Sequence, residues 1–134
     1  MPKMIEDVEH YSVAYELDFS ELIDVWYEEE GDEPEIVGEK LEEVMEAMIM
    51  PVARKFQILD AVGQVSSWED ESFFMEDHRW RKLEEVENEI YPAFQKVLDE
   101  IKSKYGTSPS LSIKVYEATD ERHWGGEMVT ELSW

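Results

Sequence analysis

The chain has 134 residues, 43% of them apolar, and its 34 Asp and Glu residues against 12 Lys and Arg give a net charge of −22. This length favours one domain, residues 1–134, that buries about two thirds of the surface of its unfolded chain. The charge disfavours direct binding to nucleic acid or to an anionic membrane, because both depend on Lys and Arg that neutralise phosphates. The composition instead favours a basic protein as the partner.

The sequence contains no cysteine, which excludes disulfides, thiolate metal sites and cysteine nucleophiles. The first ten residues, MPKMIEDVEH, lack the apolar run of a signal peptide, and no stretch is long and apolar enough to span a membrane. We therefore expect a cytoplasmic protein, in the host cell if the gene is viral, without a cofactor.

The first expected element is a strand. In residues 11–19, Val13, Tyr15, Leu17 and Phe19 fall on one face, with Glu16 and Asp18 among the alternate positions, which is the period of a half-buried strand. Residues 20–30 place apolar side chains at helical spacing, and Ser20 fits an N-cap. We predict a short helix there, with a strand as the alternative.

Two longer amphipathic helices are predicted, over residues 34–62 and 80–105. Pro51 and Pro92 lie inside them and should kink or divide them, because proline removes a backbone donor and clashes with the preceding turn. The second helix ends clearly, since Gly106 follows it directly.

Residues 63–77 are predicted to be a connecting loop, and residues 111–118 and 127–134 alternate as two strands of a hairpin. With the N-terminal strand beside that hairpin, the predicted fold is α+β. It consists of a small antiparallel sheet, made of the N-terminal strand plus the C-terminal hairpin, packed against two long Pro-kinked amphipathic helices.

The acidic residues are unevenly distributed. Residues 1–40 hold 14 acids against Lys3 and Lys40, whereas residues 81–105 hold six acids and five bases. A surface that only keeps a protein soluble has no need for such asymmetry, so the distribution predicts a binding face.

Four glutamates of the first long helix fall on one line opposite its apolar face, at about 100° per residue. Like charges at this spacing destabilise a helix, and the line resembles the spaced charges of a phosphate backbone. The alternative is a solvated surface rich in Glu because Glu favours helices. With the acids before the helix and two aromatic anchors, the predicted partner-binding residues are Trp26, Tyr27, Glu28, Glu29, Glu30, Asp32, Glu33, Glu35, Glu39, Glu42 and Glu46.

A small basic segment, His78 to Lys82, stands out from this acidic background. We predict that it pairs with neighbouring acids in residues 69–77. Contact with a partner is the alternative, because Arg and Trp are common interface residues.

No catalytic residue is predicted. Glu42, Glu43 and Glu46 spell EExxE, which resembles half of the magnesium-binding signature of the all-helical MazG-type nucleotide pyrophosphohydrolases, but the ExxD half is absent and the predicted strands do not suit that fold. The histidines are too scattered for a zinc motif, so no metal site is predicted either.

The size, the charge and the acidic stripe are together similar to two groups of small inhibitors. One comprises phage anti-defence proteins that mimic DNA to block restriction, CRISPR or transcription machinery, and the other comprises immunity proteins that cap nuclease toxins. The sequence thus predicts an inhibitor that occludes the basic surface of a nucleic-acid-binding protein. A toxin-immunity protein or a non-catalytic intracellular adaptor is the alternative.

Overall fold

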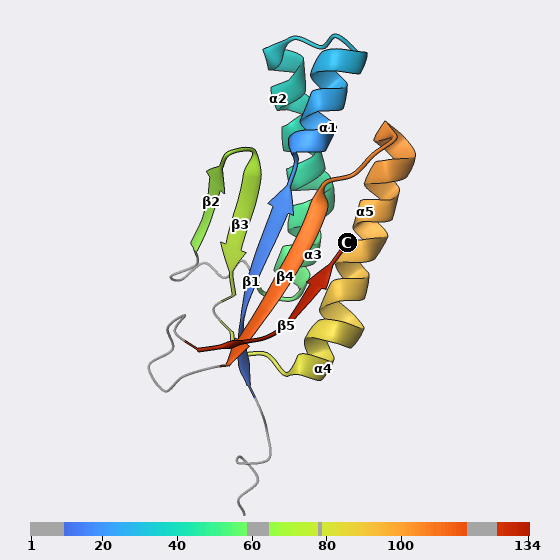
Figure 1. The fold of residues 1–134 in the computed structure, drawn as a ribbon. Helices are drawn as coiled ribbons and strands as arrows, with labels where there is room; N and C mark the ends of the chain where they lie inside the picture. Colours follow the sequence, from blue (N-terminus) through green and yellow to red (C-terminus); the bar gives the residue numbers. More distant parts are fainter. Residues whose placement is uncertain (1–9, 59–64, 78, 118–125) are drawn as a thin grey trace, which may run out of the picture.

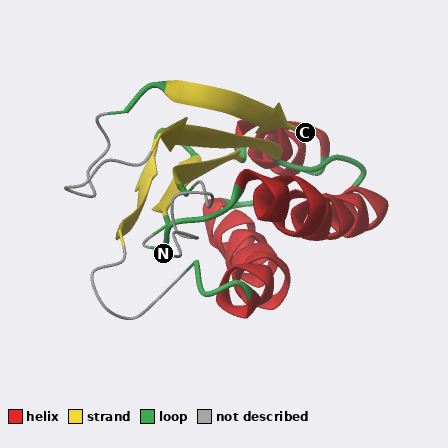
Figure 2. Ribbon diagram, turned by 90° about the horizontal axis from the view of Figure 1, so that it is seen from below, coloured by secondary structure: helices red, strands yellow, loops and turns green. Residues whose placement is uncertain are grey.

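The computed structural model describes residues 10–58, 65–77, 79–117 and 126–134, and it has the predicted α+β fold (Figure 1). A five-stranded antiparallel sheet has the order β2-β3-β1-β4-β5. The helices cover one face of this sheet (Figure 2). The strands are β1 (Tyr11–Asp18), β2 (Val65–Glu69), β3 (Ser72–Glu76), β4 (Ser110–Glu117) and β5 (Met128–Ser133).

The centre of the sheet confirms the strands that were predicted from alternation. Val13, Tyr15 and Leu17 of β1 are buried, and β1 pairs with β4 so that Tyr15 lies opposite Ile113. Strand β4 pairs in turn with β5, where Ile113 lies opposite Leu132. Since residues two apart share a face, one apolar row runs across all three strands toward the helices.

The prediction of a loop over residues 63–77 is wrong for the described part, because β2 and β3 form a hairpin there. Asp70 and Glu71 make its two-residue turn, and both have positive φ angles, 50° and 68°. Such turns usually contain glycine or asparagine. The Asp-Glu pair therefore gave no recognisable turn signal. The sheet has five strands instead of the three that were predicted.

The segment after β1 is a helix, as predicted, with α1 (Ser20–Asp24) continuing into a π-helical turn, η2 (Val25–Glu29). Ser20 is not the N-cap, however, because Phe19 occupies that position without a side-chain cap. The carboxylate of Asp18 accepts hydrogen bonds from the backbone N and the hydroxyl of Ser20, at 2.9 and 2.7 Å. An aspartate two residues earlier thus takes the capping role predicted for the serine.

The first long helix comprises α2 (Pro34–Glu43), the π-helical segment η3 (Val44–Ile49) and α3 (Met50–Lys55). The chain stays helical through Pro51, and the π-helical segment directly before it supplies the irregularity that proline requires. The helix ends at Lys55, seven residues before the predicted end, and Gln57 has a positive φ of 60°. Residues 59–62 of the predicted helix lie outside the described residues.

The second long helix has the same construction, with α4 (Leu83–Glu85), η4 (Val86–Ile90) and α5 (Tyr91–Tyr105). A π-helical segment again precedes the proline, Pro92. The helix begins three residues later than predicted, because Arg81 instead pairs with Tyr11 beside the start of β1. Its end is confirmed, since Gly106 has a φ of 89° and its N donates to the carbonyl of Lys102.

Apolar side chains from the strands and from every long helix meet in one core between the two layers. Its largest fully buried members include Trp26, Tyr15, Phe19 and Phe94. In the described ranges, no helix is both long enough and apolar enough to cross a membrane.

Candidate functional site

The predicted binding face begins at the tip of a helical hairpin. Helix α1 with η2 and helix α2 lie side by side and extend past the ends of β1 and β4 (Figure 1). The turn between them is acidic, with Glu28, Glu29, Glu30 and Glu33 exposed and Asp32 half-buried. The structure therefore places the acids before α2 next to the start of that helix.

Two of these acids share one positive charge within the chain, that of Lys40. The ammonium of Lys40 donates to Asp32 at 2.5 Å and to Glu30 at 2.8 Å. The hydrogen bonds to Asp32 and then to Glu30 raise the pKa of Lys40. Within the described residues, Glu28, Glu29 and Glu33 have no such ion pair, so most of the negative charge of the tip is uncompensated.

The four glutamates of the predicted stripe, Glu35, Glu39, Glu42 and Glu46, are all exposed. The spacing of 100° per residue applies only as far as Glu43, because η3 starts at Val44 and winds more slowly. Glu46 is consequently displaced from the line, and it pairs with Arg54 at 3.3 Å. The other three glutamates have no ion pair within the described part of the chain.

Glu43, which was not among the predicted site residues, has a different position. Its carboxylate accepts hydrogen bonds from Lys104 at 3.1 Å and from Tyr105 at 3.0 Å, which connects α2 to the end of α5. The hydrogen bond from Lys104 is the main reason that the pKa of Glu43 is lowered. Glu43 thus joins the two long helices.

The two predicted aromatic anchors differ in exposure. Trp26 is fully buried, and its ring lies edge-on to Tyr105 with 5.4 Å between the ring centroids. Its neighbour Tyr27 is 42% exposed. Trp26 therefore belongs to the core, and only Tyr27 is available beside the acidic tip.

A groove lies between the first long helix and the β2–β3 hairpin. Its volume is about 430 Å³, and Trp68 at its edge is 44% exposed. The Trp68 ring packs against Phe19 and Phe73, with centroid distances of 5.3 and 5.1 Å. The groove is lined by Gly38, Leu41, Glu42, Met45, Glu46, Met50, Trp68 and Phe73.

Sequence reasoning missed Trp68 because its segment was predicted to be a loop. The only sequence signal was the pair of short runs, VSSWE and SFFME, on either side of Asp70 and Glu71. Once β2 and β3 pair, Trp68 lies opposite Phe73 and faces the helices. Two of the predicted acids, Glu42 and Glu46, therefore share a surface with an exposed tryptophan.

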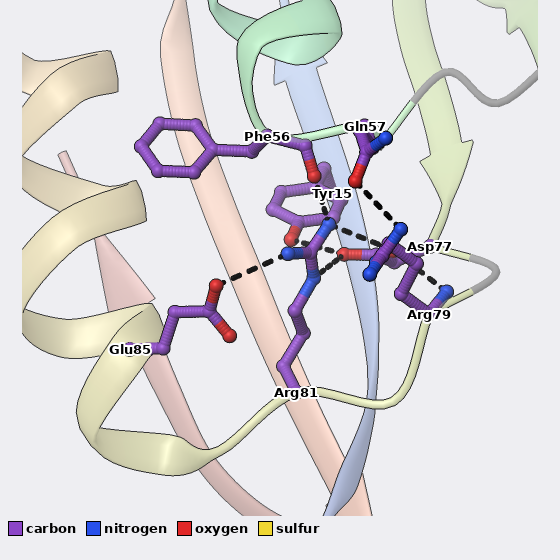
Figure 3. A network of polar contacts seen from close by, with 7 residues as sticks. All are labelled: Tyr15, Phe56, Gln57, Asp77, Arg79, Arg81 and Glu85. Atoms are coloured by element: carbon purple, nitrogen blue, oxygen red, sulfur yellow. Dashed lines mark hydrogen bonds and ion pairs between the residues drawn. The ribbon is translucent and has the colours of Figure 1, made fainter.

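A second cluster, shown in Figure 3, is buried and polar. Arg81 donates to Asp77 from Nε at 2.7 Å, and its guanidinium also reaches Glu85 and the carbonyl of Phe56. The hydroxyl of Tyr15 donates to the same Asp77 carboxylate at 2.8 Å. The predicted pairing of the basic segment is thus confirmed for Arg81, while His78 lies outside the described residues.

This cluster is built to hold the fold together. Each Asp77 oxygen accepts two hydrogen bonds, so the carboxylate has little capacity left for a substrate. Burial, followed by the charge of Asp77, raises the pKa of Tyr15 well above its usual value. The contacts connect β1, the end of β3, the end of α3 and the start of α4 at one point.

In the part of the chain that the structure describes, no three His, Asp or Glu side chains are grouped to hold a metal ion. The EExxE glutamates belong to a chain with a five-stranded sheet, which differs from the all-helical fold of the pyrophosphohydrolases that carry that signature. The chain matches no protein-family profile, no curated protein and no solved structure. Its function therefore has to be inferred from the acidic surface and the groove.

Proposed function

We propose that this protein is a non-catalytic inhibitor that occupies the basic nucleic-acid-binding surface of a partner protein. The observation that carries the proposal is the charge of residues 28–46, where ten acids face one base, Lys40, on a single helical hairpin. Those acids include the four exposed glutamates of the stripe and the four exposed glutamates of the tip. The partner surface would be one that normally binds phosphates, as in restriction, CRISPR or transcription proteins.

Electrostatics supports this mode of action. Clustered charge of one sign steers a partner of opposite sign and raises the association rate, and it repels partners of like sign. Helix α2 holds Glu35, Glu39 and Glu42 at α-helical spacing, with a rise of about 1.5 Å per residue, and so presents a row of negative charge. For a protein that binds phosphates through Lys and Arg, this row of carboxylates would resemble the negative charges of a nucleic-acid backbone.

The contrast with the second long helix supports a local role for the charge. Residues 81–105 are nearly balanced, with six acids and five bases. Both helices pack on the same sheet and both are exposed on their outer faces, so solubility alone would not require only one of them to be acidic.

The test is capture of partners from an extract of the source cell or its host, at about 0.05 M and about 0.3 M NaCl, followed by competition with DNA. We expect capture to weaken steeply with salt, and the purified partner to lose its DNA binding when this protein is added. A captured nuclease toxin encoded beside this gene would identify the immunity variant of the same function.

The matched variants carry four Glu→Gln substitutions each. Replacing Glu35, Glu39, Glu42 and Glu46 should weaken binding roughly tenfold or more, because it removes four charges from the proposed contact. Replacing the exposed Glu84, Glu87, Glu89 and Glu100 changes the net charge equally on the other helix and should have a much smaller effect. Equal effects of the two variants, or a partner that binds DNA and this protein together, would reject the proposal.

A further inference from the structure

The groove beside the first long helix combines two kinds of surface. Its floor is apolar, with Leu41, Met45 and Met50 on the helix side and Trp68 and Phe73 on the sheet side. Tryptophan is costly to leave exposed and is enriched at protein interfaces, where it gives a large contact area. The groove is therefore suited to bind an apolar side chain beside the exposed Trp68 ring.

The rim of the groove is negatively charged. Glu42 and Glu46 line it on the helix side. Glu46 pairs with Arg54, and both side chains of this pair are more than half exposed. Such exposed pairs exchange easily, so an incoming cation can replace Arg54.

Gly38 lines the groove without a side chain. It lies inside α2, where glycine costs about 0.5–1 kcal/mol relative to alanine. No other atom lies within 4 Å of the position that a Cβ would occupy there, so neither packing nor backbone conformation requires a glycine. The open space next to Gly38 leaves room in the groove for a ligand.

We infer that the groove binds an arginine-bearing, otherwise apolar segment of the partner protein. The guanidinium would lie over the Trp68 ring and reach Glu42 or Glu46, while the neighbouring apolar side chain would contact Met45 and Met50. Arginine suits this site better than lysine, because its planar group both stacks on an aromatic ring and pairs with a carboxylate. The inference rests on the proposed function, to which it adds the chemistry of the contact.

The probe for this inference is a capped four-residue peptide of alternating leucine and arginine. The control peptide has citrulline in place of arginine, which keeps the shape and removes the charge. Binding is followed by NMR, using the methyl signals of Met45 and Met50 and the indole N–H of Trp68, with Met128 as a distant reporter. We expect the signals of Met45, Met50 and Trp68 to shift saturably and the Met128 signal to stay unchanged. The affinity for the arginine peptide should be roughly tenfold above that for the citrulline peptide.

Two variants at Gly38 test the location without disturbing the core. Gly38→Gln places a neutral side chain at the mouth of the groove and should lower the affinity for the arginine peptide about fivefold or more, since it competes for the same volume. Gly38→Ala fits the same open space and should leave the affinity nearly unchanged. Trp68→Ala should also weaken binding, but its packing against Phe19 and Phe73 makes it the less clean variant.

Several outcomes would overturn the inference. Equal binding of the arginine and citrulline peptides would mean that the rim does not select charge, and shifts confined to residues 28–35 would mean that the acidic tip acts alone. Groove signals that move on simple dilution would make a second copy of this chain the occupant. If the inference fails while the stripe variant still loses the partner, the proposed inhibitor function stands; if the partner is indifferent to the stripe, that function fails independently.

Discussion

The protein uses carboxylates in two opposite ways, at the acidic hairpin and in the buried cluster around Asp77. Residues 28–46 leave most of their carboxylates exposed and unpaired within the described chain, whereas the Asp77 carboxylate is fully buried and accepts four hydrogen bonds. A buried charge must be compensated on the spot, while an exposed one is solvated. The buried Asp77 carboxylate therefore serves stability, whereas the exposed, unpaired carboxylates of residues 28–46 are not required by the fold.

The largest expected effect is on the buried cluster. Arg81→Met removes the cation beside Asp77 and leaves an uncompensated buried charge, so the free energy of unfolding should fall by about 3–5 kcal/mol. Arg54→Met, which breaks only the exposed pair with Glu46, should change it by less than about 1 kcal/mol. Urea unfolding of both variants measures the difference. Similar losses in the two variants would remove the distinction between the two regions.

The hydroxyl of Tyr15 should make the buried cluster sensitive to alkali. Because its pKa is raised in the folded state, the folded protein holds this proton more tightly than the unfolded chain does. The resulting stability is complete below about pH 10, the ordinary pKa of tyrosine, and is lost as the pH rises above it. Tyr15→Phe should thus flatten the decline in urea midpoint above about pH 10. An unchanged slope would show that another group causes the decline.

Helix α2 contains a residue, Gly38, that is not optimal for stability. Gly38→Ala is expected to raise the free energy of unfolding by about 0.5–1 kcal/mol, because alanine is the better helix former and the space is open. Gly31→Ala is the control, since Gly31 has a φ of 67° and alanine there should be destabilising. Thermal unfolding of both variants tests the pair. A loss of stability in Gly38→Ala would mean that the groove closes on this residue.

The smallest expected effect comes from the stripe itself. Neutralising Glu35, Glu39, Glu42 and Glu46 should stabilise the protein by a few tenths of a kcal/mol at low salt, because like charges one turn apart repel. The gain should vanish at high salt, where that repulsion is screened. A clear loss of stability would show that these side chains help to hold the fold, and it would weaken the case for a binding role.

Most of the fold could be predicted because the helices and three strands carry their own periodicity. The inward alternation in β1 and β4 and the glycine after α5 are local signals, and each led to the correct element. The β2–β3 hairpin had no such signal, since its turn uses Asp70 and Glu71 in a conformation that usually needs glycine. The hairpin joins the sheet through the pairing of β3 with β1, which is a contact between distant parts of the chain.

The candidate site could be predicted only in part. Composition located the acidic region, but helical spacing alone could not tell that Trp26 is buried while Tyr27 is exposed. Nor could it show that Lys40 bridges two acids of the tip or that a π-helical segment displaces Glu46 from the stripe. These features depend on which side chains meet after the helices turn back on each other.

The sequence by itself determined the net charge, its concentration in residues 28–46 and the α+β class, because charge and hydrophobic period are properties of the chain. The tertiary structure alone decided that Glu42 and Glu46 border a groove with Trp68 and that the hydroxyl of Tyr15 donates to the buried Asp77 carboxylate. Both arrangements join residues that lie far apart in the sequence. Periodicity in one segment contains no information about a surface that two segments share.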